Sequence, residues 1–255
     1  MAVHEVAQAG FGSEAEAYER ARPGYPPEVV AWAVEVLGIA RGRRIADLAA
    51  GTGKFTRLLV PLGADLVAIE PVAGMRSVLH RELPDVAVMG ATAEATALRD
   101  GSLDALTVAQ AFHWFDAPRA LEEFHRVLRP GGRIALVWNA RDRTVDWVDQ
   151  LWSVMDRVEK RAPWRRHDEW RESAFVDTPW FQPLHEATFH HTQVLTVDGV
   201  IDRFRSVSHV ASMAPGAQDA VLGEVRDVLA SHPDTRGRDE VAIPYRVDCY
   251  WAQRA

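Results

Sequence analysis

The sequence is poor in cysteine and in basic charge. Its 255 residues contain one cysteine, Cys249, which cannot form an internal disulfide and which we expect to be a small buried residue. Lys and Arg number 29 against 36 Asp and Glu, which gives a net charge of -7. Because binding to nucleic-acid phosphates requires a basic surface, this balance argues against nucleic acid as a partner.

Long apolar runs and metal-ligand spacings are also missing. No apolar run approaches the length of a membrane span, and the N-terminal MAVHEVAQAG has neither the basic start nor the apolar block of a signal peptide. We therefore expect a cytoplasmic protein with no membrane partner. His190, His191 and His209 show no spacing typical of a metal site and have no acidic cluster beside them, so we predict no metal.

What the chain does contain is an alternation of apolar strands and amphipathic helices. The predicted strands lie at 43–50, 64–70, 84–90, 103–112 and 133–139, and the predicted helices at 26–37, 54–62, 71–81 and 116–128. Such alternation is typical of a parallel sheet covered on both faces, and ligands bind such sheets beyond the carboxyl ends of the strands. The residues at which those ends are expected are Asp47, Glu70, Gly90, Phe112 and Asn139.

Beyond residue 140 the composition changes. Residues 141–183 are rich in Trp and Arg and are predicted to form a helical cap that lies over the binding site. Residues 184–255 supply two closing strands, at 184–196 and 240–254, with helices between them. Residues 1–140 then form the core domain, with an N-terminal flap.

The stretch DLAAGTGKFT, at residues 47–56, contains a glycine-rich loop whose ligand must be identified. A phosphate loop would need glycine where Leu48 stands and Ser or Thr where Phe55 stands, so that pattern fails twice. A dinucleotide fingerprint would need a third glycine where Thr56 stands, so it fails once. Neither phosphate-binding pattern describes this loop.

The pattern that fits is acid-x-small-x-Gly-x-Gly, which is met by Asp47, Ala49, Gly51 and Gly53. Two glycines let the backbone approach an uncharged nucleoside without a Cβ collision, which suits a ligand that carries no phosphate. The alanine at position 49 implies either a negative φ there or a turn that tolerates a methyl group. Lys54 is expected to be an exposed residue of the first helical turn.

An acid follows the second predicted strand. Glu70 stands 17 positions after Gly53, close to the spacing of a ribose-binding acid, and a carboxylate there can accept hydrogen bonds from both ribose hydroxyls. A solvated acid at a strand end is the alternative reading. Ala93 and Glu94 follow the third strand in the same way.

Four stretches together carry a family resemblance: DLAAGTGKFT, AIEPVAGM, ATAEATALRDGSLDALTVAQAFHWFD and HRVLRPGGRIALVWN. They resemble the class I methyltransferases that use S-adenosylmethionine (SAM), and are most similar to the small-molecule branch that includes trans-aconitate methyltransferase-like proteins. The resemblance implies a Rossmann-like, doubly wound α/β fold with a seven-stranded, mostly parallel sheet whose last strand is antiparallel, plus the helical cap. It departs from the family at Ala49, where glycine is usual.

The resemblance also implies the cofactor, SAM, its product S-adenosylhomocysteine (SAH), and a set of contacts. Arg22 is expected to pair with the methionyl carboxylate, and Asp47 to lie near the ammonium group, through water. Met75 is expected either to line the adenine pocket or to fill the core. For Arg20, an ordinary surface charge is nearly as well supported as a contact with the cofactor. The expected cofactor-binding residues are Tyr18, Arg22, Asp47, Ala49, Ala50, Gly51, Gly53, Glu70, Pro71, Met75, Ala93, Glu94, Gln110 and Ala111.

The acceptor side is expected after the fourth strand, at QAFHWF. Methyl transfer from a sulfonium needs a base only if the acceptor must lose a proton, so His113 is either a catalytic base, a hydrogen-bond donor or a wall residue. An aromatic face such as that of Trp114 attracts a sulfonium. The expected substrate-binding residues are Tyr25, His113, Trp114, Asn139 and Arg141.

Three functions remain open. The leading one is methylation of a small molecule, for example a carboxylic acid or a specialised metabolite, by a monomer or homodimer. The family's Asn/Asp-Pro-Pro-Tyr signature is missing, which disfavours nucleic acids and protein amides as acceptors. The alternatives are a SAM-binding enzyme with a non-methylating reaction such as cyclisation, and a non-catalytic SAM-binding module.

Overall fold

A single sheet organises the protein. The computed structural model describes residues 23–159, 174–176, 178–211 and 213–255, and within them seven strands form one sheet in the order β3-β2-β1-β4-β5-β7-β6. The strands are β1 (Arg44–Leu48), β2 (Asp65–Ile69), β3 (Ala87–Met89), β4 (Leu103–Ala109), β5 (Leu128–Arg141), β6 (His185–Thr196) and β7 (Glu240–Gln253). Strands β1 to β5 pair in parallel, whereas β7 is antiparallel to both β5 and β6. The predicted fold class is confirmed.

The helices lie close to their predicted positions. They are α3 (Pro27–Leu37), α4 (Thr56–Leu59), the 3-10 turn η1 (Val60–Leu62), α5 (Ala73–Glu82), the 3-10 turn η2 (Phe112–Trp114), α6 (Ala117–Val127), α7 (Asp146–Glu159), α9 (Val197–Arg205), α10 (Ser208–Ala211) and α11 (Pro215–Ser231). The helix predicted at 54–62 is divided into α4 and η1, because Pro61, the second residue of η1, has no N–H to continue the helical hydrogen bonding. The fifth strand begins earlier than predicted, at residue 128.

Two apolar layers cover the sheet. On one face α3 buries Val29, Ala33 and Leu37, which recur every four residues along the helix. On the other face α6 buries Leu121 and Phe124. Because β1 pairs in parallel with both β2 and β4, the carboxyl ends of these three strands lie at one common edge.

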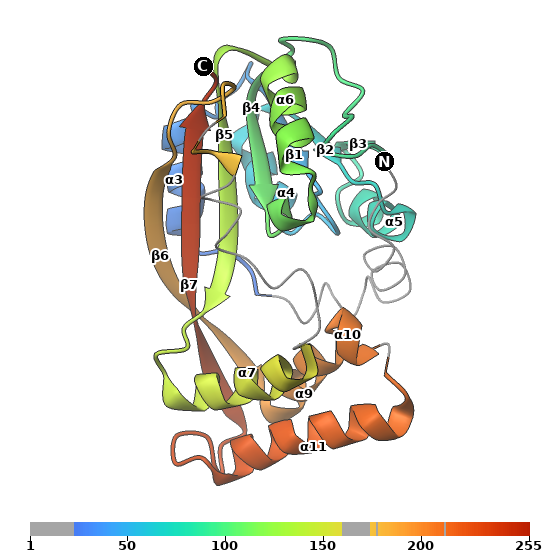
Figure 1. Cartoon of the computed structure of the whole chain (residues 1–255), viewed down its shortest axis with the longest axis vertical. Helices are drawn as coiled ribbons and strands as arrows, with labels where there is room; N and C mark the ends of the chain where they lie inside the picture. The colour runs from blue at the N-terminus through green and yellow to red at the C-terminus, as the bar shows by residue number, and fades with distance from the viewer. Residues whose placement is uncertain (1–22, 160–173, 177, 212) are drawn as a thin grey trace.

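The helices that follow β5 in the described part of the chain form a separate layer beyond that edge (Figure 1). Both β5 and β6 end there, and the chain continues from them into α7 and α9. Helices α7, α9, α10 and α11, which we call the helical lobe, pack around an apolar cluster that includes Val241, Ile243 and Tyr245 of β7. The three-part division of the chain stays a prediction, although helices from two of its parts share this cluster.

The β6–β7 pair reaches into the lobe because its pairing continues beyond the end of β5. The pairing of β7 with β5 ends where Arg141 lies opposite Tyr245, while the pairing with β6 continues to Thr196 opposite Glu240. Pro244 lies just past the end of β5, where its missing N–H costs least, and its carbonyl accepts a hydrogen bond of 3.0 Å from the Asp142 amide. Among the described residues, no helix has both the length and the apolar character needed to span a membrane.

Candidate active site

The loop after β1 turns sharply over the carboxyl edge of the sheet. Three of its residues have positive φ: Ala49 (50°), Gly51 (60°) and Gly53 (89°). The Ala50 amide donates to the Ile69 carbonyl of β2 at 3.1 Å, which fixes the loop to the neighbouring strand. The loop therefore tolerates a methyl group at Ala49 in the left-handed region, and the alternative expectation of a negative φ there is wrong.

The loop of residues 49–53, which we call the glycine loop, contains two glycines with different roles. A Cβ built on Gly53 would lie 3.1 Å from both Leu79 and Leu83, so α5 packs directly on the backbone at this point. A Cβ on Gly51 would meet, among the described residues, only the Met75 sulfur, at 3.7 Å. Gly53 thus allows α5 to pack closely on the loop, whereas Gly51 keeps a bare backbone at the edge of the sheet. Met75 is itself buried.

Glu70 meets the glycine loop, as the sequence led us to expect. Its Oε2 accepts a hydrogen bond of 2.8 Å from the Gly51 amide, and its Oε1 accepts one of 2.8 Å from the Val72 amide. Glu70 is 3% exposed. Burial raises the pKa of the Glu70 carboxyl above its ordinary value, an effect opposed by the two amide donors. An acid and a bare loop therefore share one corner of the sheet.

Arg76 supports this corner and was not anticipated from the sequence. Its Nη1 donates to the carbonyl oxygens of Glu70 (2.8 Å) and Pro71 (2.6 Å). The guanidinium also lies against the end of β3, because a Cβ on Gly90 would be 3.0 Å from its Cζ. An arginine on an amphipathic helix has no sequence pattern that would reveal this contact.

Asp47 is closed off by two hydroxyl groups. Its Oδ2 accepts from Thr56 Oγ1 at 2.6 Å and its Oδ1 accepts from Thr107 Oγ1 at 2.7 Å, and the residue is 1% exposed. Burial raises the pKa of Asp47 to about 6, although both hydroxyl groups lower it. The threonine that breaks the dinucleotide fingerprint thus holds the end of β1. The sequence-based role of Asp47 at the cofactor's ammonium group stays a prediction.

The turns after β3 and β4 are tied together. Glu94 Oε1 accepts a hydrogen bond of 3.0 Å from the Asp116 amide, which lies at the start of α6. Ala93 is buried beside it. The acid after the third strand therefore lies at the same edge as Glu70 and also orders the loop that carries His113.

The loop after β4 presents the candidate acceptor residues. Gln110 has a φ of 60°, and its amide donates to the Val137 carbonyl at 2.8 Å. Ala111 is buried, and the η2 turn then places the rings of His113 and Trp114 with their centroids 5.0 Å apart. Both side chains are half-buried. This geometry is compatible with His113 as a catalytic base and with His113 as a residue in the wall of the acceptor site.

Two other candidates lie in aromatic contacts at the same edge. The Tyr25 ring meets Phe55 edge-on, with the centroids 5.1 Å apart. The Arg141 guanidinium lies 5.1 Å from the centroid of the Trp152 ring of α7. Arg141 therefore joins the end of β5 to the helical lobe.

The Asn139 amide is hydrogen bonded at both ends. Its Nδ2 donates to the Gly24 carbonyl at 2.9 Å, and its Oδ1 lies 2.8 Å from His191 Nε2. The predicted acceptor contact at Asn139 is untested by this arrangement. Tyr18 and Arg22 lie outside the described residues, as do the cap residues 160–173. Among the residues described, no group of three or more His, Cys, Asp or Glu side chains is arranged to hold a metal ion.

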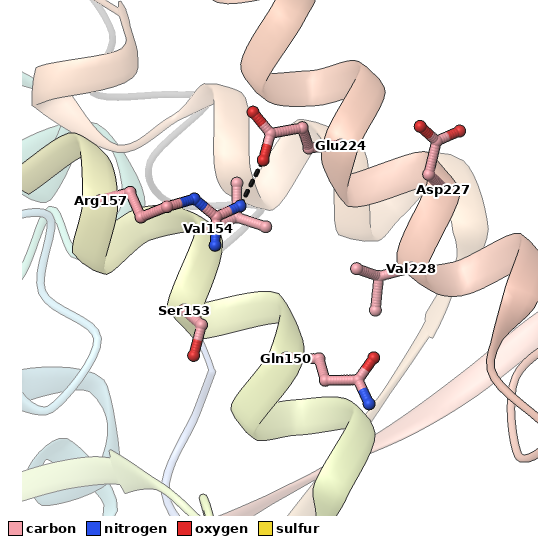
Figure 2. A pocket seen from close by; sticks show the side chains of 7 residues that line it. All are labelled: Gln150, Ser153, Val154, Arg157, Glu224, Asp227 and Val228. Carbon is pink, nitrogen blue, oxygen red and sulfur yellow. Dashed lines mark hydrogen bonds and ion pairs between the residues drawn. The ribbon is translucent and has the colours of Figure 1, made fainter.

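A hollow of about 390 Å³ lies elsewhere, on the helical lobe (Figure 2). Its walls belong to α7 and α11, and Arg157 forms an ion pair with Glu224 across it. The lining residues are Gln150, Ser153, Val154, Arg157, Glu224, Asp227 and Val228. Neither helix carries a predicted site residue, so this hollow is separate from the corner where the glycine loop meets Glu70.

Comparison with known proteins gives a consistent picture. Residues 46–136 match a family model described as a methyltransferase domain. Uncharacterized methyltransferases of Mycobacterium bovis and Mycobacterium tuberculosis are each 40% identical to this chain over 245 residues, which cover 96% of either chain. The structure is similar to that of a protein assigned as a type II methyltransferase in Anaeromyxobacter dehalogenans, with a TM-score of 0.64, 25% identity, and coverage of 91% of this chain and 96% of that one.

A further solved structure is similar in fold alone. It is phosphoethanolamine N-methyltransferase 2 of Haemonchus contortus in complex with S-adenosyl-L-methionine, with a TM-score of 0.59 and 14% identity. The match covers 99% of this chain and 60% of that one. These neighbours do not single out the trans-aconitate branch.

Proposed function

Because the chain belongs to the class I methyltransferase family, we propose that it transfers a methyl group from SAM to a small-molecule acceptor. The observation that carries the proposal is the hydrogen bond between the Gly51 amide and the Glu70 carboxylate. It joins the loop that approaches a nucleoside to the acid that accepts from its sugar hydroxyls.

The residues of this corner fit SAM better than a nucleotide with phosphates. A phosphate beside the glycine loop would face the Glu70 carboxylate, and like charges at close range repel. A ribose diol instead donates hydrogen bonds, and each carboxylate oxygen of Glu70 retains a lone pair after accepting one amide. Gly51 leaves room for the sugar, and Met75 borders that space.

The chain's own contribution to the chemistry is mainly positioning. SAM, when bound, supplies a methyl group that is already activated by a positive sulfur. The protein then has to hold the acceptor in line with that methyl group and exclude water. Trp114 would attract the positive sulfur through its aromatic face, and His113 would take a proton only from an acceptor that must lose one.

The acceptor that we propose is a small anionic or aromatic molecule. Arg141 supports this choice, because it places a cation against the Trp152 ring at the end of β5. A guanidinium pairs with a carboxylate in a bidentate manner, and the ring of Trp114, which is only half-buried, would pack on an aromatic acceptor. A cytoplasmic location, the trans-aconitate-like branch, and a monomeric or homodimeric state complete the proposal.

The test is calorimetric titration of SAH into wild type and into Glu70→Gln. Loss of the charged acceptor should weaken SAH binding at least tenfold, because hydrogen bonds to a charged group contribute about 1.5–3 kcal/mol each. Glu82→Gln is the matched control, since Glu82 is exposed on α5 and lies outside the corner. Equally tight binding by Glu70→Gln and wild type would contradict the ribose assignment.

A second experiment separates methylation from its alternatives. The protein is incubated with isotope-labelled SAM and an extract of small metabolites, and the products are examined by mass spectrometry. Methyl transfer predicts an acceptor that gains one labelled methyl group. A labelled SAM fragment without a methylated acceptor would support a non-methylating reaction, and SAH binding without any turnover would support a binding module.

A further inference from the structure

Three residues from distant parts of the chain, Gly24, Asn139 and His191, are joined by hydrogen bonds at the carboxyl edge of the sheet. We call this group the clasp. The Asn139 Nδ2 donates to the Gly24 carbonyl at 2.9 Å, and Asn139 Oδ1 lies 2.8 Å from His191 Nε2. Only the NH₂ group of an amide can donate to a carbonyl, so the oxygen of Asn139 faces the histidine. His191 Nε2 therefore carries a proton and donates a hydrogen bond to Asn139 Oδ1.

The sheet brings these residues together across an intervening strand. Asn139 lies opposite Val247, and His191 lies opposite Tyr245, so β7 runs between the two partners. Two strand spacings are about 10 Å, which the side chains of Asn139 and His191 span together. The His191 ring stacks on Tyr245 with centroids 5.3 Å apart, and this contact fixes its direction. Burial lowers the pKa of His191, so the neutral ring is favoured.

The far end of the clasp leads to the glycine loop. Gly24 is followed by Tyr25, whose ring meets Phe55 at 5.1 Å, and Phe55 is buried two residues after Gly53. Pro26 and Pro27 then begin α3 and restrict the backbone on that side. Holding the Gly24 carbonyl therefore fixes where the Tyr25 ring lies relative to the loop.

We propose that Asn139 and His191 are positioning residues that hold Gly24 and Tyr25 against the glycine loop and thereby increase the affinity for SAM. The inference rests on the proposed function, because it assigns the clasp to the cofactor corner. Neither residue touches the cofactor in this assignment. His191 acts through Asn139, and Asn139 acts through the backbone at Gly24.

The first test measures SAH affinity by calorimetry in variants of His191. His191→Leu removes the donor and should weaken SAH binding roughly three- to tenfold, the range expected for one hydrogen bond. His191→Gln restores an N–H donor near the same position and should bind SAH within about twofold of wild type. His190→Leu is the matched control, because His190 is exposed on the same strand and faces the opposite side.

The second test needs no cofactor. Hydrogen exchange of the peptide that contains Gly24 and Tyr25 should be faster in His191→Leu and in Asn139→Asp, and unchanged in His190→Leu. Asn139→Asp keeps an oxygen toward His191 but loses the donor to the Gly24 carbonyl. A purely structural role would lower thermal stability in His191→Leu while leaving SAH affinity and this exchange rate at wild-type values, and that result would overturn the inference.

The outcome can be told apart from failure of the proposed function. If wild type does not bind SAH, the proposed function fails, and hydrogen exchange still shows whether the clasp holds Gly24. If wild type binds SAH and all the His191 variants bind it equally well, the proposed function stands and the clasp has no part in cofactor affinity.

Discussion

The corner around the glycine loop and the helical lobe are stabilised by different interactions. In the corner, Glu70 and Asp47 are almost completely buried and accept hydrogen bonds from amides and hydroxyl groups. In the lobe, the interior is mainly an apolar cluster, although Arg203 of α9 is also buried, and ion pairs lie at the surface, as between Arg143 and Asp149. Exposed pairs of this kind contribute little to stability.

This difference has a functional consequence. Buried polar groups tolerate few alternative arrangements, because each unsatisfied donor or acceptor is costly, so the corner suits one unchanging ligand. An apolar cluster tolerates exchange of side chains of similar volume, so the lobe can vary its shape without disturbing the corner. We therefore expect cofactor binding to depend on the corner, and the choice of acceptor to depend on the lobe.

The largest effect that sharpens this comparison is expected for Trp152→Ala. Trp152 is 6% exposed and packs on Phe204 with ring centroids 5.0 Å apart. Its truncation should lower the free energy of unfolding by about 3–5 kcal/mol, as measured in urea. SAH affinity, measured where the variant is folded, should change by less than about threefold, because no residue of the corner lies in this cluster.

Phe55→Ala is the matched change at the corner, since Phe55 is 2% exposed and contacts Tyr25. It should reduce both stability and SAH affinity. If Trp152→Ala instead abolished SAH binding in a folded protein, the two regions would not be separable in the way described above.

The next largest effect is the dependence of stability on pH that the titration of Asp47 should cause. Burial raises the pKa of folded Asp47 from its ordinary 3.8 to about 6, so the folded protein binds this proton more tightly than the unfolded chain does. The contribution of Asp47 to the free energy of unfolding should therefore fall as the pH rises from about 4 to 6, by on the order of 2 kcal/mol. Asp47→Asn should flatten that part of the urea-unfolding profile.

Thr107→Val provides the complementary change for Asp47. It removes a hydrogen bond of 2.7 Å that lowers the pKa of the Asp47 carboxyl, so the decline with pH should become steeper. Profiles of equal slope in wild type and Asp47→Asn would mean that Asp47 does not titrate in this range.

Much of the corner could be predicted from the sequence because short stretches of the chain mark its strands and the residues at their ends. Apolar runs mark the strands, and parallel strands that end together bring Glu70 to the glycine loop. What the sequence could not reveal depends on pairs that no spacing rule connects. Thr107 reaches Asp47 across 60 residues, and the Arg76 side chain turns back to the carbonyls of Glu70 and Pro71.

The lobe was less predictable for a related reason. Its helices were expected from periodicity, but periodicity does not tell which apolar faces meet. Helix α7 packs on α11 although more than 50 residues separate them in the chain. The clasp through His191 was likewise hidden, because two adjacent histidines on a strand give no sign of which one faces Asn139.

The smallest expected effects come from a pair of opposite substitutions, one in each region. Ala49 has a φ of 50°, which costs an L-residue free energy that glycine does not lose, so Ala49→Gly should stabilise the corner by about 0.5–1 kcal/mol. Gly223 lies within α11, and a Cβ there meets nothing within 4 Å among the described residues, so Gly223→Ala should stabilise the lobe by about 0.5–1 kcal/mol. Urea unfolding measures both changes. A loss of stability in Ala49→Gly would mean that the methyl group of Ala49 contributes more packing than its backbone strain costs, and the corner would then depend on apolar contacts as the lobe does.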